Sequence, residues 1–144
     1  MQYIKSCGVI AYKTLKNANY YLVIRSLNGD IGFPKGHMET GESEIETAIR
    51  ELKEETNIEV NVTDGFRRQI EYPMPGRPDT IKQSVYFLGE CISNHIICQE
   101  TEVKNADFLP FSEALELLTF EDTKKMLKDA EDFLSAKKHL GGAG

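Results

Sequence analysis

The sequence predicts an α/β (α+β) fold in which helices pack against a mixed β-sheet. Three observations support this fold class: short β-branched runs recur along the chain, one amphipathic segment interrupts them, and helical patterns end the sequence. The chain has 144 residues, of which 40% are hydrophobic and 28% charged, so we expect one domain over residues 1–140. Residues 141–144, Gly-Gly-Ala-Gly, are expected to form a flexible tail.

Two strands are predicted before the first helix. Residues 4–12 and 20–24 are rich in β-branched and aromatic side chains, and an Asn-Ala-Asn turn at 17–19 separates them. Between residues 26 and 41, repeated glycines, a proline and an Asn-Gly pair indicate a loop. A helix is predicted to follow this loop.

The second half of the chain alternates strand and turn signals and then becomes helical. Residues 58–62 predict a short strand, and residues 66–72 and 81–88 predict a strand pair around a loop at 73–79. A late strand is predicted at 106–111. Two helices are expected at 112–118 and 121–137.

The first helix is predicted to start at Ser43, because Ser43 and Glu46 form a capping-box pattern. Apolar residues recur at helical spacing and are predicted to form its core face: Ile45, Ala48, Ile49 and Leu52. Acidic residues fall within an arc of roughly 100° on the opposite flank. They are Glu51, Glu54 and Glu55, together with Glu44.

This acidic flank suggests a metal site. Glu51 and Glu55 repel each other at i, i+4, and Glu54 and Glu55 lie at the helix end where the dipole disfavours anions. A divalent cation among these carboxylates would offset both effects, and hard oxygen ligands suit Mg²⁺ or Mn²⁺. The alternative is an acidic face that is merely solvated.

The loop and the helix together resemble the signature of the Nudix hydrolases. Residues 36–58 follow Gly-x5-Glu-x7-Arg-Glu-U-x-Glu-Glu-x-Gly-U, where U is aliphatic, except that Asn57 replaces the last glycine. Asn tolerates a left-handed backbone next best after Gly, so we expect only a modest stability cost. The resemblance implies an α/β/α sandwich with the catalytic loop and helix packed on the sheet. It also implies metal-dependent hydrolysis of a nucleoside diphosphate linked to another group.

The resemblance also implies roles for individual residues. Arg50 is expected to orient a catalytic glutamate, and Glu42 to hold the loop–helix junction. The implied metal ligands are Gly36, through its carbonyl group, Glu51, Glu54 and Glu55. The catalytic set is expected to be Arg50, Glu51, Glu54 and Glu102. The general base stays open among Glu51, Glu54, Glu100 and Glu102.

Segments outside the signature are similar to the asymmetrical diadenosine tetraphosphate hydrolases, mainly at residues 6–10, 65–72 and 82–88. This similarity implies cleavage of diadenosine tetraphosphate to ATP and AMP. Lys35, His37 and Lys82 are expected to contact the phosphate chain, and Tyr72 to stack on adenine. Ile31 stands where this pattern usually has Trp, so any packing made by that indole is in doubt.

Two other functions stay open at this stage. A Nudix pyrophosphohydrolase acting on other nucleoside triphosphates, diphosphoinositol phosphates or RNA 5′ ends is one, and a non-catalytic nucleotide-sensing module is the other. The net charge of −6, without a basic stripe, argues against a nucleic-acid partner. Three cysteines without metal-type spacing are typical of a reduced, cytoplasmic protein. No apolar run approaches the roughly 20 residues of a membrane span, and nothing in the sequence requires more than a monomer.

Overall fold

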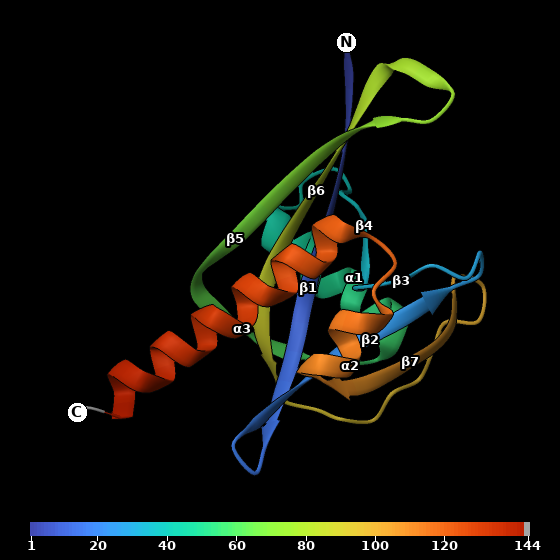
Figure 1. Ribbon diagram of the computed structural model, residues 1–144. Helices are drawn as coiled ribbons and strands as arrows, with labels where there is room; N and C mark the ends of the chain where they lie inside the picture. Colours follow the sequence, from blue (N-terminus) through green and yellow to red (C-terminus); the bar gives the residue numbers. More distant parts are fainter. Residues whose placement is uncertain (143–144) are drawn as a thin grey trace.

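A mixed β-sheet forms the centre of the computed structural model, which describes residues 1–142, without the side chains of 138–142 (Figure 1). The strand order is β3-β2-β1-β6-β5, while β4 pairs with β1 and β7 pairs with β2. The pairing of β1 with β6 is parallel, and the other pairings are antiparallel. The strands are β1 Gln2–Leu15, β2 Ala18–Ser26, β3 Ile31–Gly32, β4 Lys35–His37, β5 Val60–Met74, β6 Arg77–Cys91 and β7 Val103–Pro110. The helices are α1 Glu44–Thr56, α2 Phe111–Leu117 and α3 Glu121–Gly142.

Helices cover both faces of the sheet, which confirms the predicted fold class and its three layers (Figure 1). Because side chains alternate along a strand, Val9 and Ile10 of β1 enter different cores. Val9 packs with Ala48 and Leu52 of α1, whereas Ile10 packs with side chains of α2 and α3. No helix among residues 1–142 is long and apolar enough to span a membrane.

Several predicted boundaries differ from the structure. The predicted loop at 26–41 contains two short strands, β3 and β4, and β4 adds a pairing to β1. The strands predicted at 58–62 and 66–72 are one strand, β5, with a shift in register between Val62 and Arg67. Gly65 lies in this shift at φ +91°, a conformation that glycine adopts without strain. The structure places Gly141 and Gly142 in α3, while residues 143–144 of the predicted tail lie outside the described residues.

Helix α1 begins and ends as the sequence predicts. The Ser43 hydroxyl accepts a hydrogen bond from Glu46 N at 3.1 Å, and the Glu46 carboxylate accepts one from Ser43 N at 2.9 Å. Asn57 ends the helix in the left-handed conformation at φ 67°, and its backbone N–H donates to Lys53 O. The Asn57 side chain also donates to His95 O at 3.0 Å, which fixes the segment that follows β6.

The predicted core face of α1 is only half right. Ala48 and Leu52 are fully buried, but Ile45 and Ile49 are 40% and 37% exposed. Two of the acids that we expected on the opposite flank, Glu51 and Glu55, are buried instead. The helix therefore turns part of its acidic arc inward, against β4 and the segment before β7.

Candidate active site

Arg50, in the middle of α1, ties the helix to the loop before it. Its Nε and Nη2 atoms donate to the two carboxylate oxygens of Glu42 at 2.6 and 3.0 Å, and Nη2 also donates to His37 O at 3.0 Å. Glu42 in turn accepts hydrogen bonds from Glu39 N and the Thr47 hydroxyl, both at 2.9 Å. The hydrogen bonds from Arg50 and then from Glu39 hold the pKa of Glu42 at about 2. This geometry fits the expected role of Glu42 at the loop–helix junction.

The same guanidinium reaches two of the predicted catalytic glutamates. Arg50 Nη1 donates to Glu51 Oε1 at 2.9 Å and to Glu54 Oε2 at 3.2 Å. The side chain of Glu54 is 51% exposed, whereas Glu51 is buried. Arg50 therefore orients one carboxylate inside the protein and one at the surface.

Three carboxylates converge beside α1: Glu51, Glu55 and Glu102. One oxygen from each lies within 4.8 Å of the others. Glu51 and Glu55 are only 8% and 4% exposed, and Glu102 comes from the exposed segment before β7. Gln99 N donates to Glu55 O at 3.1 Å and Glu102 N donates to Gln99 O at 3.0 Å. These backbone bonds bring the Glu102 segment to the end of α1.

Glu55 carries the main electrostatic strain of this cluster. Burial, followed by repulsion from Glu51 and Glu102, raises its pKa to about 8. Its Oε2 atom is buried and has no hydrogen-bond partner among the described residues. A buried carboxylate oxygen without a partner is costly, unless a ligand compensates for it.

The cluster fits a divalent cation. Mg²⁺ takes oxygen ligands at about 2.1 Å in octahedral geometry, which requires ligand oxygens a few ångströms apart. Glu51, Glu55 and Glu102 satisfy this spacing, and Glu55 also has an unpartnered buried oxygen that a cation could coordinate. Gly36 is closely packed here, since a Cβ atom on it would lie 2.1–2.3 Å from the carboxyl group of Glu51. The backbone of the predicted ligand Gly36 therefore contacts the site, whereas Glu54 pairs with Arg50 outside these three carboxylates.

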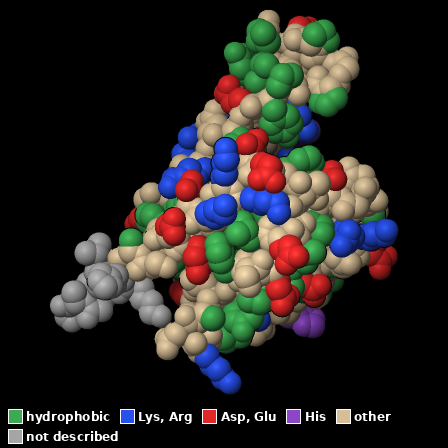
Figure 2. Space-filling view, in the orientation of Figure 1, with side chains coloured by type: hydrophobic (Ala, Val, Ile, Leu, Met, Phe, Trp, Pro, Cys, Tyr) green, Lys and Arg blue, Asp and Glu red, His purple; other side chains and the backbone are tan. Residues whose placement is uncertain are grey.

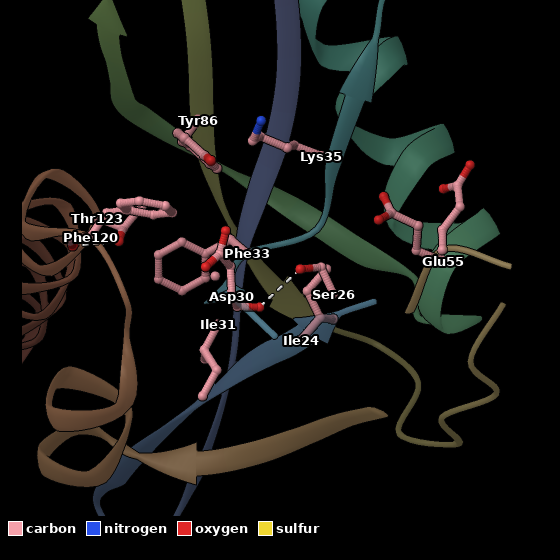
Figure 3. Close-up of a pocket in the computed structure, with 12 residues that line it drawn as sticks. Ile24, Ser26, Asp30, Ile31, Phe33, Lys35, Glu55, Tyr86, Phe120 and Thr123 are labelled. Carbon is pink, nitrogen blue, oxygen red and sulfur yellow. Dashed lines mark hydrogen bonds between the residues drawn. The ribbon is translucent and has the colours of Figure 1, made fainter. Parts of the chain in front are cut away.

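Two adjoining cavities extend from this cluster. The first, of about 250 Å³, reaches Glu55 and Glu102 (Figure 3). The second, of about 330 Å³, reaches Ile70 and Tyr72. The two share four lining residues, which are Lys35, Tyr86, Phe120 and Thr123. We call the combined space the cleft.

Lys35 lies in the middle of the cleft, at the start of β4. Its stem packs over Gly8 of β1, where a Cβ atom would approach Lys35 Cβ to 2.7 Å and Pro34 O to 2.3 Å. Burial lowers the pKa of its amine. Gly8 therefore allows the loop to lie close to β1 and to hold Lys35 between the carboxylates and Tyr72.

The structure brings three of the four predicted substrate-binding residues together. Tyr72 and Lys82 are paired across β5 and β6, with Lys82 Nζ 6.0 Å from the centre of the Tyr72 ring, and Lys35 lines the same cavity as Tyr72. His37 is exposed on β4 and lines neither cavity, although its carbonyl group accepts a hydrogen bond from Arg50. Its expected phosphate contact stays a prediction.

The end of the chain supplies cleft residues that the sequence reasoning missed. Phe120 and Thr123 line both cavities, and Thr123 donates to Phe120 O at 2.8 Å. The turn before α3 is fixed to β3, because Ile31 N donates to the Thr119 hydroxyl at 2.7 Å and Thr119 N donates to Ile31 O at 3.1 Å. Phe120 is a large aromatic residue that is 55% exposed. The signal that could have identified Phe120 is its position, because it is an aromatic residue in the short connection between the helices predicted at 112–118 and 121–137.

Comparison with known proteins agrees with this geometry. A model of the NUDIX domain matches residues 7–130, which is most of the chain. The chain belongs to the Nudix family. It is 31% identical over 143 residues to the bis(5′-nucleosyl)-tetraphosphatase (asymmetrical) of Rattus norvegicus, and 30% identical to that of Sus scrofa. Each match covers 91% of this chain and 95% of the relative.

Solved structures show the same Nudix fold. The binary complex of a C. elegans Ap4A hydrolase superimposes with a TM-score of 0.83 at 23% identity, covering 92% of this chain and 98% of that one. The resemblance that the sequence suggested is thus confirmed, as is the class of enzyme. The protein is a Nudix hydrolase, a pyrophosphohydrolase similar to the asymmetrical tetraphosphatases.

Proposed function

We propose that this Nudix hydrolase cleaves dinucleoside polyphosphates asymmetrically, with diadenosine tetraphosphate giving ATP and AMP. The observation that carries the proposal is the cleft, which leads from three carboxylates past Lys35 to the aromatic rings of Tyr72 and Phe120. A polyphosphate with a base at its end has the same sequence of chemical groups. The similarity to asymmetrical tetraphosphatases over 91% of the chain supports the same substrate class.

Residues that line the cleft, together with Lys82 beside it, bind different parts of the substrate. Lys35 and Lys82 offer ammonium groups to phosphate oxygens, and Tyr72 with Phe120 offers aromatic faces to a base. The buried, hydrophobic wall formed by Tyr86 and Phe33, whose rings meet edge-on at 6.0 Å, excludes water from one side of the chain of phosphates.

The carboxylates would hold a divalent cation and accept a proton. Glu51, Glu55 and Glu102 would hold Mg²⁺ or Mn²⁺, together with the backbone of Gly36. When bound, this ion neutralises phosphate charge and lowers the pKa of the attacking water. Glu54 and Glu102 are the more exposed glutamates of the predicted catalytic set, and either can accept a proton from that water. Arg50 keeps Glu51 and Glu54 in a fixed orientation.

Product analysis tests the proposal directly. The purified protein is incubated with diadenosine tetraphosphate and Mg²⁺, and the nucleotides are separated by chromatography. We expect equal amounts of ATP and AMP. Symmetric release of ADP would contradict asymmetric cleavage. Turnover of a nucleoside triphosphate, a diphosphoinositol phosphate or a 5′-triphosphorylated RNA, without turnover of the dinucleotide, would contradict the substrate class.

A further inference from the structure

The far end of the cleft is mostly apolar but contains one acidic side chain. Ile70, Tyr72, Tyr86 and Phe120 form most of its wall, and Asp122 of α3 lines it as well. Asp122 is exposed, and its side chain makes no ion pair or hydrogen bond with the side chains described, which end at residue 137. Its carboxylate is therefore free to accept hydrogen bonds from a ligand that occupies this cavity.

The packing of α3 along β5 places Asp122 near Tyr72. The rings of Phe133 and Phe66 meet at 5.6 Å, and Asp129 pairs with Arg68 at 3.2 Å. Residues 66, 68, 70 and 72 share one face of β5, and residues 122, 126, 129 and 133 share one side of α3. The two elements run antiparallel along this contact, so Asp122, which lies beyond Met126 on this side of α3, is toward the Tyr72 end of β5. Both residues line the same cavity, as this packing requires.

We propose that the Asp122 carboxylate accepts hydrogen bonds from the base bound against Tyr72 and thereby selects guanine over adenine at this position. The inference rests on the proposed function, because it takes the cleft to hold a nucleotide, and it extends the proposed substrates from diadenosine tetraphosphate to dinucleoside tetraphosphates that carry guanine. An ionised carboxylate only accepts hydrogen bonds. Guanine presents two adjacent donors, N1–H and the N2 amino group, which a carboxylate can accept in a bidentate arrangement. Adenine presents its N6 amino group beside an acceptor, N1, so it offers only one hydrogen bond and places a lone pair against the carboxylate.

The test compares Asp122→Asn with a matched control, Glu121→Gln. Both substitutions remove one negative charge from the first turn of α3, but Glu121 does not line the cavity. For each protein, kcat/KM is measured with diguanosine tetraphosphate and with diadenosine tetraphosphate. We expect Asp122→Asn to lower the guanine-to-adenine ratio about tenfold, as loss of a charged, bidentate contact implies, and Glu121→Gln to leave it unchanged. An unchanged ratio in Asp122→Asn, or an equal change in both variants, would overturn the inference.

A binding measurement separates this inference from the proposed function. Affinities for GMP and AMP are measured by calorimetry in EDTA, where no turnover occurs. If neither tetraphosphate is hydrolysed but Asp122→Asn still lowers the preference for GMP, the inference holds and the proposed function fails. If both are hydrolysed and all three proteins bind GMP and AMP with the same relative affinity, the inference fails and the proposed function stands.

Discussion

Glu55 is the residue on which the candidate metal site depends most. It is 4% exposed, its Oε2 atom has no partner among the described residues, and Glu51 and Glu102 crowd it with like charge. Each of these features is unfavourable in the protein alone and becomes favourable when a divalent cation binds. Evolution toward stability alone would replace such a carboxylate with a neutral residue.

Replacing Glu55 with glutamine tests this interpretation. The amide keeps the shape of the side chain but supplies a weaker, uncharged ligand, so we expect kcat to fall by at least about a thousandfold, given the several kcal/mol that a metal contributes to the transition state. At pH 8.5, where Glu55 of the wild type carries its unpaired charge, the metal-free variant should unfold at the same or a higher temperature than the wild type. Steady-state kinetics with Mg²⁺ and thermal denaturation monitored by circular dichroism measure the two effects.

Glu59→Gln is the matched control for this substitution. Glu59 lies just after α1, is exposed, and pairs only weakly with Lys53 at 3.8 Å. We expect kcat of Glu59→Gln to stay within about twofold of the wild type, because an exposed ion pair contributes little to the stability of the fold. Equal turnover by Glu55→Gln and the wild type would refute the assignment of Glu55 to the metal.

At the scale of elements, the C-terminal end of α1 explains how Asn57 substitutes for the usual glycine. Its backbone is left-handed at φ 67°, and its side chain donates to His95 O. Asn57→Gly should be close to neutral in the free energy of unfolding, since it relieves strain but loses one hydrogen bond. Asn57→Ala should cost about 1–2 kcal/mol, because alanine suffers the strain and makes no such bond.

Urea denaturation of the three proteins gives the free energies of unfolding. The expected order of stability is wild type close to Asn57→Gly, with Asn57→Ala lowest. Alanine as stable as asparagine would show that the left-handed cap has no role. If kcat of Asn57→Gly stays near that of the wild type, then asparagine in place of the usual glycine does not change the orientation of Glu54 and Glu55.

Local signals were enough to predict most elements, because capping and strand patterns depend on neighbouring residues. Ser43, Glu46 and Asn57 mark both ends of α1 without any tertiary information. The rotation of α1 could not be predicted in this way. Ile49 is as hydrophobic as Leu52, and only the close approach of β4, which Gly36 permits, decides that Glu51 rather than Ile49 is buried. Periodicity therefore identified the helix but not its buried side.

The site was predictable where its residues share one segment. Arg50, Glu51 and Glu55 are close in sequence, so their spacing alone places them near one another. Phe120 and Asp122 reach the cleft only because α3 folds back across the sheet, and the contact between Thr119 and Ile31 spans 88 positions. Such a contact depends on the whole topology, which a single sequence does not specify.

For the whole molecule, the acidic balance of −6 follows partly from the site. Figure 2 shows acidic and basic side chains interspersed over the face that carries α3. The excess acidic residues therefore do not form a continuous negative patch on this face. Glu51, Glu55 and Glu102 instead gather acidic groups at one end of the cleft. One bound divalent cation would change the formal balance from −6 to about −4. An acidic chain can therefore bind a polyphosphate, provided that the cation binds as well.

This charge distribution predicts how the stability of the protein depends on pH. The pKa of Glu55 is raised to about 8 from an ordinary value of 4.5, so between these values the folded protein holds a proton that the unfolded chain releases. The stabilisation that comes from this proton on Glu55 is complete below about pH 4.5 and is lost as the pH rises through 8. Hydrogen bonds from Arg50 and Arg67 hold the pKa values of Glu42 and Glu44 at about 2, so the contribution of these two residues to stability does not change over this range.

The metal-free protein should therefore show a Tm that falls from pH 5 to pH 8.5, measured by calorimetry in EDTA. Millimolar Mg²⁺ should raise Tm strongly at pH 8.5 and little at pH 5, because the cation binds the deprotonated carboxylates and competes with the proton. In Glu55→Gln, both the fall of Tm with pH and the effect of Mg²⁺ should be much smaller. Parallel curves for the wild type and this variant would show that another group controls the pH dependence, and would remove Glu55 from the account of both stability and metal binding.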